Sequence, residues 1–422
     1  MTQLEEQMNT SALEQKASPS LAEFVVILSM MMSMTALSID AMLPALGQIS
    51  VDLGVASAND RQLVISIIFL GTALGQLFFG PLSDSFGRKI AVYSGYALFI
   101  TGSLVAMFSV SFPMLLAGRV MQGLGISASQ AVGMALVRDQ FEGRRMARIM
   151  SFTMTIFILV PMVAPTIGQT LLSLVGWRGI FGSFMVFALV TLAWFSLRIP
   201  ETLHPEDRAP FSFNRILGAV REIMTIRPSV GYALTAGLMN GIFIGYLNSS
   251  QQIFQEQYGL GEKFPLFFAI ISLALGTAAF MNARLVMRYG MKKLARTALG
   301  VIFALSIVFV GVAFGFAGQP PLWVLMAFLM LTFFCTGILF GNLNSMAMQP
   351  LGHLAGVGAA VIGSFATLIS MLLGTLIGRS YNGTILPLIV GIVILSGIAN
   401  LVIRWAGKEQ TISPVSEKAL LQ

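Results

Sequence analysis

The sequence predicts an all-α membrane protein with twelve transmembrane helices in two pseudo-symmetric six-helix halves. Three observations support this fold class. Of the 422 residues, 56% are hydrophobic and 10% are charged, whereas soluble domains carry about 25% charged residues. The apolar residues form continuous runs close to the roughly 20 residues that a helix needs to cross a bilayer. One long polar loop divides the runs into two sets that share short motifs.

Twelve spans are predicted because the runs are long and continuous, whereas barrel strands read as short alternating segments. The first half, 22–197, contains spans at 22–46, 62–82, 90–108, 112–137, 149–172 and 180–197. The second half, 230–405, contains spans at 230–254, 264–285, 294–316, 322–348, 355–378 and 384–403. Segments 1–21 and 406–422 are predicted tails. The linker, 198–229, includes a stretch at 213–226 with helical apolar spacing, which is typical of a helix on the membrane surface.

The basic residues predict the orientation. Most of the 25 lysines and arginines lie in segments that face the cytoplasm if both termini do, as positively charged loops usually do. The exceptions are Arg119 inside span 4 and four residues on the other side: Arg61, Arg178, Lys263 and Arg379. The N-terminal segment is polar and acidic, unlike a cleavable signal peptide. We therefore expect a multi-pass inner-membrane protein with both termini cytoplasmic.

Several functions are excluded by what the sequence lacks. The net charge of +7 follows the loop pattern and does not indicate a nucleic-acid partner. The single cysteine, Cys335, cannot form an intramolecular disulfide, and both histidines, His204 and His353, fall in predicted loops. No G-x-x-x-x-G-K-[ST] loop is present, so nucleotide hydrolysis is not expected. The chain is predicted to be no enzyme, to need no metal or cofactor, and to act as a monomer driven by an ion gradient.

The stretch between spans 2 and 3 is expected to reverse the chain. Gly80 and Gly87 lie within it, and Gly87 suits a backbone position that a side chain would penalise. Arg88 and Lys89 favour the cytoplasmic side. The preference of basic residues for the cytoplasmic side does not explain the acid Asp84. The residue types alone therefore allow either a basic turn with an incidental acid or a functional motif.

Asp40 and Arg119 are the acid and the base that lie well inside the spans. A charge at the membrane centre costs about 2.5–3.5 kcal/mol on insertion scales, so such residues are more often functional. Their depths agree, about 9–10 Å from the outer ends of spans 1 and 4 at helical rise, so the side chains could meet. Two interpretations follow: a permanent ion pair that fixes packing, or a proton site at Asp40 that Arg119 modulates.

Other polar and conformationally special residues mark the spans. In span 5, Pro161, Pro165 and Gly168 predict a bent helix that packs closely against a partner, and a plain packing kink is the alternative. Glycines such as Gly71 and Gly374 are expected to permit close helix contact. Because polar groups in hydrocarbon face partners or cavities, the predicted substrate contacts are Asn240, Tyr246, Asn342, Met34 and Gln122.

Four motifs resemble those of the major facilitator superfamily, and specifically its Bcr/CflA drug-resistance branch of proton antiporters. Gly80–Lys89 matches the helix 2–3 signature of the superfamily, and Arg119-x-x-Gln122-Gly123 matches its helix 4 signature. The segment 40–46 resembles the branch's helix 1 acid followed by a proline. The segment 161–168 resembles the antiporter helix 5 motif, although its usual Gly-Pro opening reads Ala164-Pro165 here.

The resemblance implies a major facilitator fold and a rocker-switch mechanism around a central cavity. It implies that Asp40 is a proton site modulated by Arg119, and that Asp84, Gly87 and Arg88 act in gating, with Asp139 as a partner of Arg88. We therefore expect a proton-coupled exporter of small amphipathic compounds or drugs. The alternatives are a metabolite or siderophore carrier of the same fold, and a non-transporting receptor or enzyme.

Overall fold

The computed structural model describes residues 19–407, and all regular elements in this range are helices. The predicted tails lie outside the described residues except for positions 19–21 and 406–407. Within the helices, the side chains outside this description are those of Arg144, Ala147, Ser151, Met154, Thr155, Phe157, Ile158, Arg215, His353 and Ala355.

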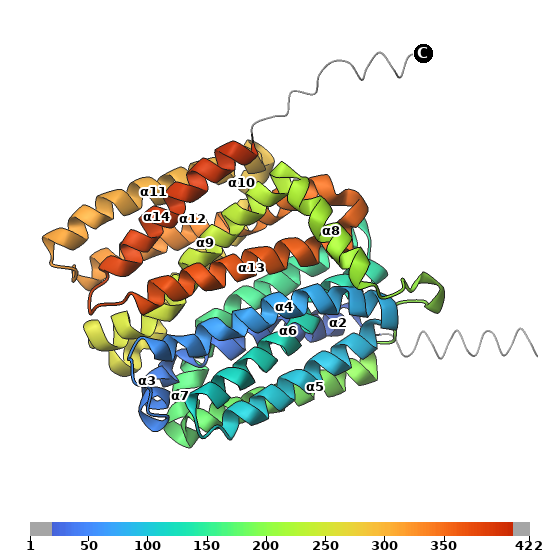
Figure 1. Ribbon diagram of the computed structural model, residues 1–422, viewed down its shortest axis with the longest axis horizontal. Helices are drawn as coiled ribbons and strands as arrows, with labels where there is room; N and C mark the ends of the chain where they lie inside the picture. Colours follow the sequence, from blue (N-terminus) through green and yellow to red (C-terminus); the bar gives the residue numbers. More distant parts are fainter. Residues whose placement is uncertain (1–18, 408–422) are drawn as a thin grey trace, which may run out of the picture.

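The helices of the first half form one bundle, drawn in blue to green in Figure 1. They are α2 (Leu21–Asp40), α3 (Leu46–Asp52), α4 (Leu63–Phe86), α5 (Arg88–Met107), α6 (Phe112–Gln140) and α7 (Gly143–Arg198). Within it, α6 packs against α4 and α5, and α7 packs against α2 and α5.

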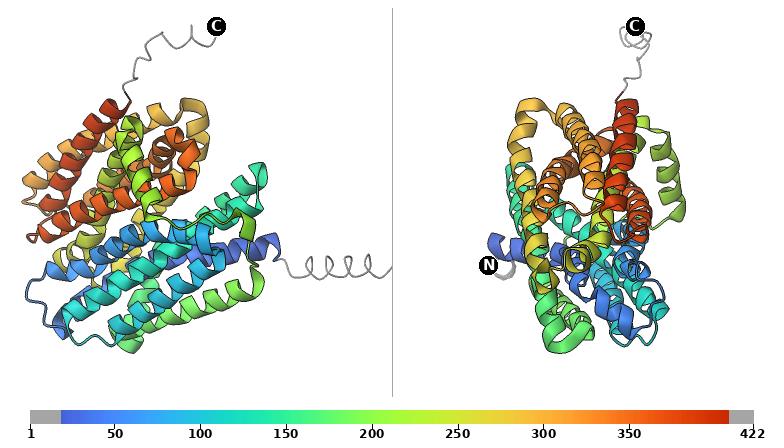
Figure 2. Two further views of the ribbon diagram at one scale, coloured as in Figure 1. Left: turned by 45° about the vertical axis from the view of Figure 1, so that its right-hand side comes forward. Right: turned by 90° about the vertical axis from the view of Figure 1, so that its left-hand side faces the viewer.

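The second half forms the other bundle, drawn in yellow to red in Figure 1. It contains α9 (Arg227–Gln251), α10 (Phe264–Tyr289), α11 (Met291–Gly315), α12 (Leu322–Met348), α13 (Ala355–Arg379) and α14 (Leu386–Ala406). A helix α8 (Phe213–Thr225), lying beside α9 and α13, occupies the linker segment for which a short helix is predicted. The two bundles meet where α4 packs against α13 and α7 against α10, and Figure 2 shows them one above the other.

Eleven described helices are long and apolar enough to span a membrane. The twelfth predicted span is found within α7, which covers predicted spans 5 and 6 in 56 residues. A straight helix of that length would extend about 84 Å, far more than the roughly 30 Å hydrocarbon layer. The chain instead leaves helical geometry at Gly176, where φ is 70° and ψ is 176°. The two parts of α7 therefore serve as two antiparallel spans.

The turn between spans 2 and 3 is shorter than the predicted span ends, 82 and 90, imply. Helix α4 continues through Pro81 to Phe86, and α5 begins at Arg88. Gly87 alone has non-helical geometry, with φ 105° and ψ 159°. The reversal is this short because glycine adopts a backbone conformation that side chains exclude.

Close helix packing explains the glycines of the spans. A Cβ atom built on Gly71 in α4 would lie 2.1 Å from the carbonyl oxygen of Val120 in α6, and one on Gly374 in α13 would lie 2.5 Å from Ile244 in α9. Lipid tails are as apolar as the side chains, so close backbone approach is a main source of helix attraction in membranes. The predicted packing role of these glycines is confirmed.

The two ends of the bundle have different contacts, and we name them for reference. The linker face carries the α4–α5 turn, the linker between the halves and the described N-terminal end on the right of Figure 1, and the described C-terminal end at the top of that view. The distal face carries α3 and the α9–α10 connection, on the left of the same view.

Candidate functional site

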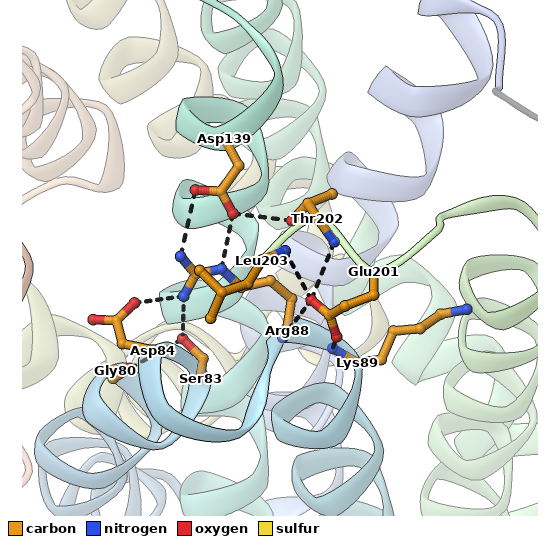
Figure 3. Close-up of polar contacts among 9 residues, drawn as sticks. All are labelled: Gly80, Ser83, Asp84, Arg88, Lys89, Asp139, Glu201, Thr202 and Leu203. Atoms are coloured by element: carbon orange, nitrogen blue, oxygen red, sulfur yellow. Dashed lines mark hydrogen bonds and ion pairs between the residues drawn. The ribbon is translucent and has the colours of Figure 1, made fainter. Parts of the chain in front are cut away.

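On the linker face, Arg88 is the centre of a polar cluster that we call the latch: Gly80, Ser83, Asp84, Gly87, Arg88, Lys89, Asp139, Glu201 and Thr202. The guanidinium donates from Nη1 to Asp84 Oδ1 at 2.5 Å and to Ser83 Oγ at 2.9 Å, and from Nε to Asp139 Oδ2 at 2.9 Å (Figure 3). Its side chain is only 3% exposed. The arginine thus joins the ends of α4 and α6 through two ion pairs. Asp139 was expected as its partner, and Asp84 is a second one.

Glu201 anchors the linker to the latch and was not anticipated from the sequence. Its carboxylate accepts hydrogen bonds from the backbone N–H groups of Arg88 at 2.9 Å and Lys89 at 3.0 Å, at the start of α5 (Figure 3). It also accepts from the N–H groups of Thr202 and Leu203, both at 3.1 Å. A carboxylate at a helix N-terminus satisfies free N–H donors and interacts favourably with the helix dipole. The signal for it was an acid directly after a span end on the same face as Gly80–Lys89.

Thr202 and the Gly87 backbone complete this cluster. The Thr202 hydroxyl donates to Asp139 Oδ2 at 2.9 Å, so the linker contacts α6 as well as α5. A Cβ atom built on Gly87 would lie 2.7 Å from Glu201 Oε2. Glycine is therefore required here both for its positive φ and for the space that Glu201 occupies.

Asp84 also faces the other half of the molecule. Its Oδ2 atom lies 3.6 Å from the position that a Cβ atom would take at Gly356, in the first turn of α13. Gly356 lies at the N-terminal end of α13, where the helix dipole attracts an anion. Gly80 approaches α13 too, with Ala360 Cβ 3.7 Å from a built Cβ. The contact is found, and its role in gating remains a prediction.

Asp40 and Arg119 are both buried, but they form no ion pair in this conformation. Arg119 donates from Nε to the Val64 carbonyl oxygen and from Nη1 to Gln122 Oε1, each at 2.8 Å. Among the described residues, the Asp40 carboxyl forms no hydrogen bond or ion pair. The sequence allowed the two side chains to meet, but in this conformation Arg119 bonds to Val64 and Gln122 instead.

Asp40 lies at a break in the first span, and Gly168 packs beside it. Helix α2 ends at Asp40 and is followed by a 3₁₀ turn, Leu43–Ala45, that contains Pro44. A Cβ atom on Gly168 would lie 2.0 Å from the carbonyl oxygen of Ala41. The helix with Pro161 and Pro165 therefore packs closely against a partner, as predicted, and that partner is the residue next to the buried acid.

A cavity of about 390 Å³ lies between the halves on the linker face. Its wall comprises Met32, Gln76, Gly80, Ser83, Asp84, Gln130, Ala131, Met134, Ala135, Arg138, Asn344, Gly356, Ala359, Ala360 and Gly363. The size suits a small organic molecule. The wall combines apolar methionines with amides and, at the mouth, the opposite charges of Asp84 and Arg138.

The five predicted substrate contacts lie outside this wall. Gln122 holds Arg119 and donates to Ser103 Oγ at 2.7 Å, and Asn342 donates to Asn282 Oδ1 at 2.8 Å. The buried Tyr246 packs on Phe268 and Phe333, and Met34 is buried in the core. Asn240 is half-buried in α9. Their contact with substrate stays a prediction for another conformation.

On the distal face, direct bonds close the two halves together. We call these residues the distal clasp: Asn59, Asp60, Arg61 and Gln62 with Gln252, Glu256, Arg379 and Tyr381. Arg61 pairs with Glu256 at 2.5 Å, and Arg379 pairs with Asp60 at 2.7 Å. Gln252 of α9's C-terminal extension donates to Asn59 Oδ1 at 2.7 Å.

The clasp and its surroundings account for three basic residues that break the charge pattern. Arg61 and Arg379 pair across the halves, and Arg178 lies 3.9 Å from Asp52. Burial raises the pKa of Tyr381, and the Glu256 carboxylate acts in the same direction while Arg61 lowers it. The Tyr381 hydroxyl therefore stays protonated and donates to the Gln252 carbonyl oxygen at 3.4 Å.

With this geometry in view, comparison with known proteins identifies the family. The sequence model of the family described as Major Facilitator Superfamily matches residues 20–375 of this chain. The chain belongs to the Major Facilitator Superfamily. It is therefore a multi-pass membrane transporter and not an enzyme. Among the described residues, no group of three or more His, Cys, Asp or Glu side chains is placed to hold a metal ion.

Relatives in this superfamily resemble the chain over most of its length. It is 30% identical to the uncharacterized MFS-type transporter YdgK of Bacillus subtilis, covering 83% of this chain and 87% of that protein. It is 26% identical to a bicyclomycin resistance protein homolog of Haemophilus influenzae, covering 87% and 91%. It is 27% identical to the multidrug resistance protein MdtL of Shewanella oneidensis, covering 77% and 81%.

Solved structures agree with the fold. The structure superposes on the xylose transporter XylE from E. coli in a partially occluded inward open conformation with a TM-score of 0.70, at 12% identity over 93% of this chain and 99% of that one. It superposes on the human organic anion transporter MFSD10 with a TM-score of 0.68, at 17% identity over 92% and 100%. At these identities the likeness shows the major facilitator fold alone.

Proposed function

We propose that this transporter exports small amphipathic compounds, drugs among them, in exchange for protons by alternating access. The observation that carries the proposal is Asp40. Among the described residues, Asp40 is the one acidic side chain that is buried in the membrane helices. None of these residues forms an ion pair or a hydrogen bond with its carboxyl group. An unpaired charge in such a place is costly, so a carboxyl group that binds and releases a proton fits this environment.

The surroundings of Asp40 support a coupling role. The acid ends α2 where the chain breaks, and Gly168 of the Pro161–Pro165 helix packs against the next residue. A movement between α2 and α7 would therefore change the environment of the carboxyl group. Arg119, which lies buried with its Nη2 unbonded, is proposed to reach Asp40 in another conformation and favour its ionised form.

The two faces support alternating access. The distal face is held by bonds between the halves, whereas the cavity opens on the linker face. We infer that both termini are cytoplasmic in the inner membrane, so that the cavity receives substrate from the cytoplasm. In the opposite state, Gly80, Asp84, Gly87, Arg88, Lys89 and Asp139 would hold the linker face closed.

The names of the relatives support export of drugs, since two of them are described by bicyclomycin or multidrug resistance. Asn240, Tyr246, Asn342, Met34 and Gln122 are retained as proposed substrate contacts. A metabolite or siderophore carrier of the same fold remains the alternative. It would use the same proton site and differ in the compounds that move.

The test is a compound screen in everted membrane vesicles with an acidified lumen. We expect an exported compound to cause proton efflux from the lumen, with one proton per cycle because one buried acid is available. Transport of an uncharged compound would then respond to membrane potential. Asp40→Asn should abolish the compound-dependent efflux, while Asp207→Asn, in the exposed linker, should leave it unchanged. Full proton efflux in Asp40→Asn would refute the proposal.

A further inference from the structure

A second cavity, of about 390 Å³, is a groove between α2 and α7 inside the first half. None of the described residues that line it belongs to the cavity between the halves. Helix α2 contributes Val26, Met30, Ser33 and Leu37 to its wall. Their spacing of three and four residues places them on one face of that helix. The groove is therefore built along one stripe of the first span.

The two parts of α7 form the other walls of the groove. Val160, Val163 and Ile167 lie before the break in this helix, and Phe184 and Phe187 lie after it. Val163 is 51% exposed and Ile167 is 44% exposed, so the wall continues onto the outer surface of the bundle. Because these residues belong to membrane spans, the groove opens toward lipid hydrocarbon.

The lining favours an apolar occupant. The hydroxyls of Ser29 and Ser183, two of its polar groups, donate to the carbonyl oxygens of Val25 and Ile180 in their own helices, each at 2.7 Å. They are thus already satisfied. Water is disfavoured in an apolar cavity, and an empty one would lose the dispersion contacts of its walls. The material that is available at this depth is an acyl chain.

The length of the groove matches one leaflet of the bilayer. The chain rises about 16 Å from Val26 to Leu37 at 1.5 Å per residue. This is about half of the roughly 30 Å hydrocarbon thickness. A lipid of the leaflet on the linker face would therefore have its headgroup near the start of α2 and the end of α7.

An ion pair closes the groove at that level. Glu23 lies seven residues before Met30 in α2, and Trp194 lies seven residues after Phe187 in α7, so both continue the stripes of the wall. The Glu23 carboxylate accepts from Arg198 Nε at 2.6 Å, from Arg198 Nη2 at 2.9 Å and from Trp194 Nε1 at 3.0 Å. Tryptophan and arginine are typical of membrane interfaces.

Arg198 keeps one donor for a headgroup. Its side chain is 38% exposed, and Nη1 donates to no other described residue. The charge of Glu23 is already neutralised by its three hydrogen bonds. A guanidinium N–H is a strong donor to a phosphate oxygen, so the charge at the linker-face end of the groove is complementary to a phosphodiester.

We propose that a diacyl phospholipid of the linker-face leaflet occupies this groove, with one acyl chain between α2 and α7 and its phosphate on Arg198 Nη1. The site is independent of the proposed function. The wall ends at Ala41 and Ile167, which flank the contact between Ala41 and Gly168. The bound chain thus packs along the seam between α2 and α7, beside Asp40.

The test is a lipid titration of the purified full-length protein in detergent, in which native mass spectrometry counts the lipid molecules that stay bound. The first probe is dioleoylphosphatidylglycerol. The second is dioleoylglycerol, which has the same two chains and no phosphate. We expect the wild type to retain one phospholipid and to bind dioleoylglycerol about tenfold more weakly, which corresponds to the loss of one hydrogen bond between charged groups.

Two variants fill the groove from different helices. Ser183→Phe in α7 and Met30→Trp in α2 place a ring where the acyl chain would lie, so each should abolish retention of the phospholipid. The matched control is Ser94→Phe in α5. Ser94 is an exposed serine outside the groove, and its hydroxyl also donates to a carbonyl of its own helix. It should bind as the wild type does.

Arg198→Gln tests the phosphate contact without filling the groove. It should lower the affinity for the phospholipid to that for dioleoylglycerol and leave the affinity for dioleoylglycerol unchanged. Unchanged retention in Ser183→Phe and Met30→Trp, or equal affinities of the wild type for the two lipids, would overturn the proposal. Tighter binding of tetraphenylphosphonium than of the phospholipid, lost in Ser183→Phe, would assign the groove to amphipathic compounds and also overturn it.

Discussion

The α4–α5 turn and its counterpart in the second half, the α10–α11 turn, share a backbone but differ in chemistry. Gly87 has φ 105° and ψ 159°, and Gly290 has φ 75° and ψ 152°; each precedes the next helix directly. The first turn carries Asp84 and Arg88, whereas Met287 and Met291 occupy the corresponding positions in the second. Met287 is 86% exposed, while the Arg88 side chain is 3% exposed.

This difference separates what the fold requires from what the latch requires. Reversing the chain in one residue needs a glycine, and both halves keep it. Joining α4, α5, α6 and the linker through Arg88 needs acids at the latch, and the corresponding turn of the second half has none of them. A Cβ atom on Gly290 would meet no atom within 4 Å, whereas one on Gly87 would collide with Glu201. The second turn thus serves as an internal control for the first.

Asp84→Ala should have the largest effect. It removes the carboxylate between Arg88 and the first turn of α13, a charged hydrogen bond of about 1.5–3 kcal/mol. We expect the linker face to open, with a roughly tenfold shift in conformational populations. Spin labels at Ile90 in α5 and Lys293 in α11, in a Cys335→Ser background, would report the distance between the halves. Met287→Ala should leave that distance distribution unchanged, and equal distributions for Asp84→Ala and wild type would remove the latch role.

Glu201→Gln should have an intermediate effect. The amide has one acceptor oxygen, so it cannot accept all four N–H bonds, and the charge at the start of α5 is lost. An interaction with the helix dipole contributes about 0.3–1 kcal/mol, so we expect a few-fold population shift with the same labels. Glu262→Gln, an exposed glutamate on the distal side, is the control. A shift as large for Glu262→Gln as for Glu201→Gln would show that the linker anchor is not specific.

The smallest effect should be the difference between Gly87→Ala and Gly290→Ala. Both substitutions place a side chain in a backbone region that costs about 1–3 kcal/mol. Gly87→Ala adds the contact with Glu201, so its thermal unfolding temperature in detergent should fall further. Combining it with Glu201→Ala should remove this extra loss. Identical unfolding temperatures for the two single variants would mean that the Glu201 side chain moves away from the added methyl group with no loss of stability.

Much of the fold was predictable because long apolar runs leave few alternatives. The helical spans follow from the apolar runs, and the contact between Arg88 and Asp139 was expected from the resemblance to the superfamily. The break at Gly176 was also implied, since spans 5 and 6 were predicted separately. The length of the α4–α5 turn could not be predicted. Polar residues at a membrane edge can remain helical, and here only Gly87 leaves helical geometry.

The rest depended on directions around helix axes, which depth along a span does not determine. Arg119 turns toward Val64 and Gln122 instead of Asp40. Asn342 donates a hydrogen bond to Asn282, and the amides that line the cavity are Gln76, Gln130 and Asn344. Glu201 was missed because its partners in α5, Arg88 and Lys89, lie more than a hundred residues away in the chain. Each of these contacts is set by tertiary packing.

The most direct test of proton-coupled export measures proton release by the purified transporter in weakly buffered detergent solution when a compound found by the vesicle screen is added. Across a pH series, we expect the wild type to release protons on binding and Asp40→Asn to release none, because Asp40 is the proposed proton site. Equal proton release by Asp40→Asn and the wild type, at matched binding, would contradict the account.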